Sequence, residues 1–185
     1  MELTHLTAAE LTRGLDHVRQ SPKDAGTLEM IVCRPAHDER LVLDECALAP
    51  ETGMAGDHWA KGCWKSLPDG MPDPDVQVTL MNARALALIA QTRERWPLDG
   101  DNLIVDLDLS GENLPPGQII AIGSAVLQIT AVPHTGCGKF VQRYGTDARQ
   151  FVNSAQGKEL ALRGIYARII QAGVVRVGDV VRKVA

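Results

Sequence analysis

The sequence predicts a mainly β fold with accessory helices, an α+β domain built on a β-barrel. Three observations predict it: many short runs of β-branched and aliphatic residues, glycines in the turns between them, and only two or three helical segments. The chain has 185 residues, of which 45% are hydrophobic, which is enough for one domain with a sizeable core. Neither a Gly-x-Gly-x-x-Gly sequence nor a P-loop sequence occurs, which argues against a dinucleotide or nucleotide-phosphate site.

The N-terminal segment is predicted to be helical. Thr7 and Glu10 have the spacing of a capping box, and apolar residues then recur at helical spacing as far as Gln20. We therefore divide the chain into an N-terminal helical extension, residues 1–25, and a barrel domain, residues 26–185.

The barrel domain is expected to consist of short strands and two helical segments. Asn82 is a candidate N-cap for the first helical segment, which ends before Pro97, and the second covers residues 140–153 with a break near Gly145. A turn at Gly123-Ser124 predicts a hairpin. The predicted strands and extended segments are 26–34, 41–43, 46–48, 76–81, 103–105, 118–122, 125–130, 165–170 and 174–184.

The stretch from residue 50 to residue 75 differs from the rest, because glycines and prolines replace the apolar runs. A loop this long in a compact domain is more often functional than not. The alternative is an ordinary surface excursion.

Charge and hydropathy exclude several classes of protein. A net charge of −4 and a pI near 5.7 argue against a general nucleic-acid binder, which would carry a basic footprint. No apolar run reaches the roughly 18 residues that span a bilayer, and no secretory signal opens the chain. We expect a soluble, cytoplasmic protein with no nucleic-acid or membrane partner.

The four cysteines are scattered, and none forms a Cys-x-x-Cys pair. A zinc ribbon or a redox pair is therefore disfavoured, and four independent thiols are expected. Cys33 and Cys46 fall in strand-like runs and are expected in the core. Cys63 lies in the long loop and competes with Cys137 as the reactive thiol.

The most informative segment surrounds Cys137. The thiol lies between two glycines, with His134 three residues before it and Lys139 two residues after it. Glycines leave the sulfur open to close approach, and nearby cations favour the thiolate that attacks electrophiles and binds metals. His134 is a candidate to hydrogen-bond this sulfur or to relay a proton. The alternatives are a small buried cysteine in a tight turn and a polar turn histidine.

Seven segments, taken in order, resemble the MOSC family, the domain found at the C-terminus of molybdenum-cofactor sulfurases and as stand-alone bacterial proteins. They are residues 53–58, 100–109, 114–117, 122–130, 134–137, 162–168 and 173–180. The resemblance implies a MOSC-type β-barrel, similar to the pyruvate-kinase-like β-barrel, with a groove for a molybdopterin cofactor. It also implies that Cys137 carries sulfur as a persulfide or binds molybdenum.

The resemblance implies site residues and partners as well. It places Asn102 and Arg163 near the groove, together with His58. In many family members an arginine precedes the asparagine, whereas Asp101 stands there in this chain. A sulfurtransferase or a component of a molybdenum-dependent reductase is implied. The pyridoxal-phosphate domain of the sulfurases has no counterpart in this chain, so a cysteine desulfurase or a molybdoenzyme is the expected partner.

A phosphate-bearing cofactor also needs cationic side chains. Lys139, Arg143 and Arg163 are the candidates, because arginine suits bidentate phosphate contact. The alternatives are a solvated helix face for Lys139 and Arg143, and an ion pair between Arg163 and Asp179. Two other functions stay open: a non-catalytic module that binds and delivers a cofactor, and a thiol-dependent hydrolase.

Overall fold

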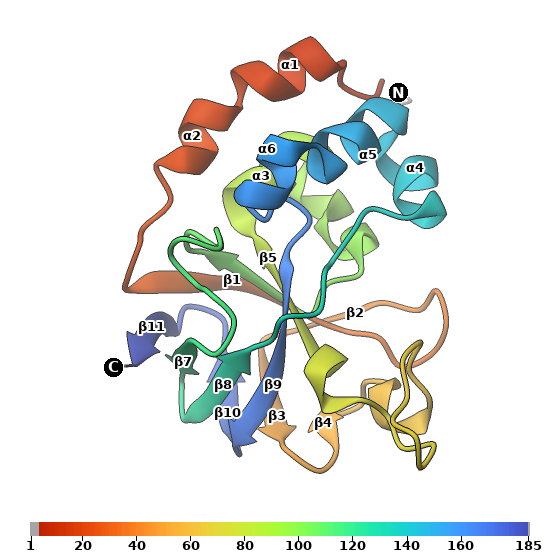
Figure 1. Ribbon diagram of the computed structural model, residues 1–185, viewed down its shortest axis with the longest axis vertical. Coiled ribbons are helices and arrows are strands. Elements are labelled where there is room, and N and C mark those ends of the chain that lie inside the picture. The colour runs from red at the N-terminus through yellow and green to blue at the C-terminus, as the bar shows by residue number, and fades with distance from the viewer. Residues whose placement is uncertain (1–3, 185) are drawn as a thin grey trace.

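Seven strands close into a barrel in the computed structural model, which describes residues 4–184 (Figure 1). Neighbours follow the order β11-β7-β8-β9-β5-β6-β1, and β1 pairs with β11 to complete the ring. Of these pairings only β5 with β6 is parallel. The barrel strands are β1 (Gly26–Cys33), β5 (Val78–Asn82), β6 (Leu103–Asp106), β7 (Ile119–Ile122), β8 (Ala125–Ile129), β9 (Ile165–Gln171) and β11 (Val180–Val184).

The remaining strands extend the barrel at one end. β2 (Leu41–Leu43) pairs with the end of β1, and a separate sheet has the order β10 (Gly173–Arg176), β3 (Glu45–Ala49), β4 (Gly53–Met54). The long loop follows β4 and contains two short 3-10 turns, η1 (Trp59–Lys61) and η2 (Pro74–Val76). The loop leads directly into β5, so one of its ends is fixed by the small sheet and the other by the barrel.

The helices gather on one side of the barrel (Figure 1). Their apolar faces and the outer face of the barrel form a second core, which is separate from the core inside the barrel. These elements are α1 (Ala8–Arg13), α2 (Leu15–Arg19), α3 (Ala83–Ala90), the 3-10 segment η3 (Arg93–Asp99), α4 (Gly138–Tyr144), α5 (Thr146–Asn153) and α6 (Ala155–Glu159). None of the helices in residues 4–184 combines the length and the apolar character needed to cross a membrane.

Local sequence signals explain most of these boundaries. Thr7 and Glu10 form the predicted capping box, and the Asn82 side chain accepts a hydrogen bond from the N–H of Ala85 at the start of α3. The Gly123-Ser124 turn joins β7 and β8 as predicted. The prediction of a β-barrel with accessory helices is confirmed.

Three element predictions were wrong. The N-terminal helix is two short helices that meet at Gly14. The predicted strand 174–184 is two strands in different sheets, because the chain turns at Gly178, which has φ +93°. Helix α6 was not predicted; the Ser154 hydroxyl caps it by accepting a hydrogen bond from the N–H of Gly157.

Candidate functional site

A pocket of about 370 Å³ lies where five segments meet. They are the loop after β1, the long loop, the turn before β6, the segment that leads into α4 and the turn before β9. The predicted residues that line it are His58, Cys63, His134, Cys137, Lys139, Arg143 and Arg163. The structure therefore brings together side chains from across the sequence, and their roles stay predictions.

Cys137 is the exposed thiol of the pocket. It is the N-cap residue of α4 and makes no side-chain capping hydrogen bond, but the backbone N–H groups of the first helical turn lie near its sulfur. Partial burial acts to raise its pKa, but the N–H groups of Phe140 and Lys139 and the charge of Arg163 outweigh it and lower the pKa. The sulfur is thus both accessible and biased towards the thiolate.

The other thiols are less available. Cys33 and Cys46 are buried, and burial raises the pKa of both, to about 11 for Cys46. Their predicted place in the core is confirmed. Cys63 also lines the pocket, but its thiol donates a hydrogen bond to the backbone carbonyl of Lys65. All four cysteines are free, as expected.

We expect iodoacetamide to label Cys137 first, with a reaction midpoint below the roughly 8.5 of an unperturbed thiol. Peptide mass spectrometry after brief labelling between pH 6 and pH 10 would check this. The buried Cys33 serves as the internal control and should react only after unfolding. Faster labelling of Cys63 than of Cys137 would contradict the assignment.

His134 is a largely buried part of the pocket wall and forms no hydrogen bond with the Cys137 sulfur in the described structure. Its side chain is 9% exposed and packs on the Tyr166 ring, with 4.5 Å between ring centroids. Burial, reinforced by the charge of Arg163, lowers the His134 pKa to about 3, although Asp101 acts in the opposite direction. The imidazole is therefore neutral at ordinary pH, and its Nδ1 is buried without a hydrogen-bond partner.

Arg163 is held by two buried carboxylates. Its guanidinium bonds to Asp101 and lies 3.4 Å from Asp99 Oδ2, and it stacks over the Phe140 ring of α4 at 5.2 Å. Burial and the neighbouring Asp101 raise the pKa of Asp99, whereas Arg163 and His134 overcome burial and lower the pKa of Asp101. Asp99 thus holds its proton more tightly than a free aspartate, and Asp101 holds its proton less tightly.

The suggested pairing of Arg163 with Asp179 was wrong. Asp179 instead accepts a hydrogen bond from the backbone N–H of Arg176, 2.7 Å away, within its own turn. Gly164, which follows Arg163, has φ +89°, and a Cβ there would lie 2.3 Å from the Leu80 carbonyl. A glycine is therefore required where this turn meets β5.

Asn102 lies beneath the pocket and does not line it. Its side chain is fully buried, and its Nδ2 donates to Asp57 Oδ2 at 3.1 Å and to the Val32 carbonyl at 3.1 Å. Its Oδ1 accepts from the backbone N–H and hydroxyl of Thr79. Because its amide is engaged within the protein, Asn102 positions the loop after β1 and the long loop.

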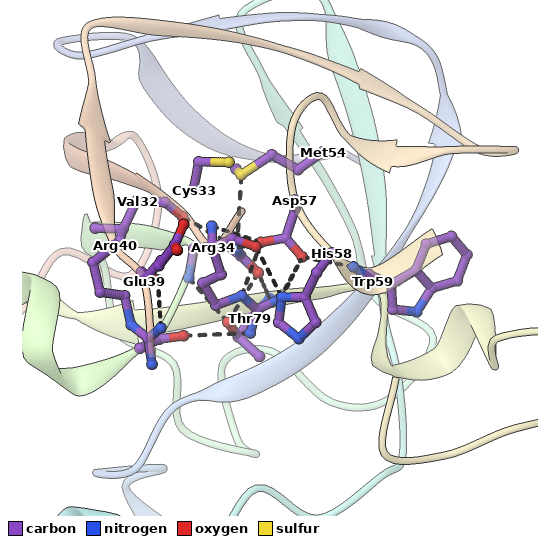
Figure 2. A network of polar contacts seen from close by, with 12 residues as sticks. Val32, Cys33, Arg34, Glu39, Arg40, Met54, Asp57, His58, Trp59 and Thr79 are labelled. Carbon is purple, nitrogen blue, oxygen red and sulfur yellow. Dashed lines mark hydrogen bonds and ion pairs between the residues drawn. The ribbon is translucent and has the colours of Figure 1, made fainter. Parts of the chain in front are cut away.

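Asp57 is the centre of that network (Figure 2). It accepts hydrogen bonds from Arg34 Nε at 2.9 Å, from Arg34 Nη2 at 3.1 Å and from the backbone N–H of Trp59 at 3.0 Å. His58 Nδ1 lies 2.8 Å from the Arg34 carbonyl, which can only accept, so Nδ1 donates. In the tautomer with its proton on Nδ1, Nε2 is an acceptor, and His58 lines the pocket.

Basic side chains dominate the outer part of the pocket. Lys139 Nζ and Arg143 Nη2 lie 2.8 Å and 3.3 Å from Asp38 Oδ1. Arg40 lies against Gly100, where a Cβ would be 3.0 Å from its Nη2. Within residues 4–184 Arg40 has no carboxylate partner, and burial together with Arg143 and Arg34 lowers its pKa.

Sequence reasoning missed several of these residues. Arg34, Asp38 and Arg40 belong to a polar turn between strands, which has no motif of its own. Asp99 and Tyr166 were also missed, because only the folded chain brings them next to Arg163 and His134. Among residues 4–184 no three His, Cys, Asp or Glu side chains come together as a metal site.

Comparison with known proteins agrees with this architecture. Among curated proteins, none matches the chain. The YuaD protein from Bacillus subtilis has a similar structure, with a TM-score of 0.61 and 17% identity, over 85% of this chain and 94% of that chain. YiiM from Escherichia coli has a TM-score of 0.54 and 21% identity, over 86% of this chain and 70% of that chain. YiiM from Geobacillus stearothermophilus has a TM-score of 0.54 and 15% identity, over 88% of this chain and 73% of that chain.

These identities are low, so the likeness shows the fold alone. The family model described as the MOSC domain matches residues 69–182, which is more than half of the sequence. That stretch contains Asn102, the Cys137 segment and Arg163. This chain belongs to the MOSC domain family.

Proposed function

We propose that this protein binds a phosphate-bearing molybdenum–pterin cofactor, or carries sulfur as a persulfide, through Cys137. One observation carries the proposal: the exposed, low-pKa thiol of Cys137 opens on the same pocket as a group of basic side chains. A soft thiolate suits molybdenum or sulfane sulfur, and cations suit a phosphate.

The residues present fit such a cofactor. The pocket volume, about 370 Å³, lies within the ~300–1,000 Å³ usual for small-ligand sites. Five cationic side chains line it against three aspartates, although the whole chain has a net charge of −4. Asp99 Oδ1 and Arg40 Nε are buried without hydrogen-bond partners, so the wall offers both an acceptor and a donor. A pterin carries complementary groups.

Each residue has a distinct part in this proposal. Cys137 would hold the metal, Lys139, Arg40 and Arg143 would hold the phosphate, and His58 Nε2 would accept a hydrogen bond. When bound, the cofactor supplies a redox-active metal centre. Arg163 is paired with Asp99 and Asp101 through its Nη atoms, and its charge acts on the site by lowering the Cys137 pKa.

The sulfur-carrier form uses the same thiolate. Cys137 would attack the outer sulfur of a donor protein's persulfide, forming the Cys137 S–S bond and releasing the donor thiolate. A cysteine desulfurase is the kind of donor required, and a molybdoenzyme the kind of acceptor. Exposure of Cys137 at the rim of the pocket supports access by another protein, which also suits a module that delivers a cofactor without turnover.

A thiol-dependent hydrolase is disfavoured. Such an enzyme needs a base beside the nucleophile. With a pKa of about 3, His134 is a weak base, and no described contact joins it to Cys137.

We expect Cys137→Ser to lose bound molybdenum and pterin, or the 32 Da sulfur adduct, by an order of magnitude or more relative to the parent. Metal analysis, pterin fluorescence and intact mass of protein purified without oxygen would measure this. Cys63→Ser, a thiol change in the same pocket, is the matched control and should keep the bound molybdenum and pterin, or the sulfur adduct. Equal cofactor and sulfur content in Cys137→Ser and in the parent would contradict the proposal.

A further inference from the structure

The loop after β1 places a carboxylate among the basic side chains of the pocket. Asp38 Oδ1 lies 2.8 Å from Lys139 Nζ and 3.3 Å from Arg143 Nη2, and its Oδ2 lies 3.0 Å from His37 Nδ1. These partners belong to α4 or to the loop itself. Asp38 is therefore the acceptor that an anionic ligand would replace.

The charges around Asp38 are not balanced. Arg143 also donates to the Leu98 carbonyl at 2.6 Å, which fixes its guanidinium at the pocket wall. Arg40 is nearby and lacks a carboxylate partner in the described residues. Two cations thus contact the single carboxylate of Asp38, and Arg40 lines the same pocket as a third cation, which leaves a positive excess there.

The contacts of Asp38 are easy to exchange. Its side chain is 52% exposed, and ion pairs at that exposure contribute only about 0–1 kcal/mol. Asp38 also has φ +63°, in the left-handed region, which aspartate and asparagine adopt more readily than other residues with a Cβ. A phosphate monoester brings about −1.5 to −2 charges and three acceptor oxygens, more than one carboxylate offers.

We propose that Asp38 is a built-in competitor: in the free protein its carboxylate occupies the place among Lys139, Arg143 and Arg40 that the phosphate monoester of a ligand takes. The ligand phosphate displaces the Asp38 carboxylate, and the loop after β1 then moves away from α4. This rests on the proposed function only for the identity of the ligand, because inorganic phosphate suffices to occupy that place.

The test compares Asp38→Asn with the parent by phosphorus NMR titration of inorganic phosphate at constant ionic strength. Asparagine removes the charge but tolerates the left-handed conformation, so the loop keeps its shape. Loss of an exposed ion pair corresponds to phosphate binding up to about fivefold tighter. Lys139→Gln should bind phosphate more weakly than the parent. Asp16→Asn removes the same charge from an exposed pair with Arg19 on α2 and is the control for net charge.

Phosphate binding to Asp38→Asn that is no tighter than to Asp16→Asn would overturn the proposal, as would undetectable binding to both. Repeating the titration in Cys137→Ser separates the two proposals. If that variant loses cofactor or sulfur yet binds phosphate as the parent does, both stand. If it keeps them while Asp38→Asn binds phosphate more tightly, only the function at Cys137 fails.

Discussion

Replacing Arg163 by methionine is expected to lower the free energy of unfolding by about 3–5 kcal/mol, because it leaves a buried negative charge without its partner. The Arg163 side chain is 9% exposed, and Asp99 and Asp101 are 0% and 1% exposed. In a domain of this size the loss corresponds to a fall of about 6–20 °C in Tm. Urea denaturation followed by circular dichroism would measure it.

The two aspartates should respond differently. Burial raises the pKa of Asp99, whereas the pKa of Asp101 is lowered, so the charge on Asp101 contributes more to the pairing with Arg163. Asp99→Asn should therefore cost less stability than Asp101→Asn, and both should cost less than Arg163→Met. If Asp99→Asn lowered the free energy of unfolding as much as Arg163→Met, the two carboxylates would not differ in this way.

The protein should lose stability on mild acidification because of His134. Its folded pKa, about 3, lies below the 6.5 of the unfolded chain, so below pH 6.5 the unfolded state binds a proton that the folded state does not. The contribution of the neutral His134 to the free energy of unfolding is fully present above pH 6.5. It falls by about 1.4 kcal/mol per pH unit towards pH 3. The depressed pKa values of Asp57 and Asp101 add acid sensitivity only below about pH 4.

Urea titrations at pH 7, 6, 5 and 4.5 would isolate the contribution of His134. His134→Gln should flatten the pH dependence in this window, whatever it does to stability at pH 7. His17→Gln, at an exposed position on α2, is the control for losing an imidazole. An unchanged slope in His134→Gln would show that its imidazole is not buried as a neutral group.

The caps and turns that depend on neighbouring residues were predicted correctly from the sequence. The capping box at Thr7, the cap at Asn82 and the Gly123-Ser124 turn depend on residues within a few positions of each other, so the sequence alone suffices. The exposure of Cys137 between two glycines is of the same kind. The barrel was predicted from the many short strands with glycine turns and from the family resemblance, but the order of its strands depends on pairings between distant segments.

Partner choice inside the pocket could not be predicted. Asn102 resembled a ligand-binding amide, but Thr79, Val32 and Asp57 converge on it from other elements. Arg163 had several acidic residues to choose from, and the path of the chain before β6 selected Asp99 and Asp101. These pairings depend on how closely segments that are distant in the sequence approach one another in the fold. The sequence pattern alone does not predict those distances.

The pairing of β1 with β11 has a consequence for synthesis. Gly26 lies opposite Val181, so the ring closes only after almost the whole sequence has left the ribosome. Contacts between such distant positions are slow to form, because a long loop must be closed first. Until then the backbone hydrogen-bonding groups of β1 that face β11 are unpaired, and apolar residues of the barrel interior are exposed to solvent. Both conditions favour aggregation. We therefore expect a nascent chain stalled before β11 to be protease-sensitive, and release of the last strand to protect it.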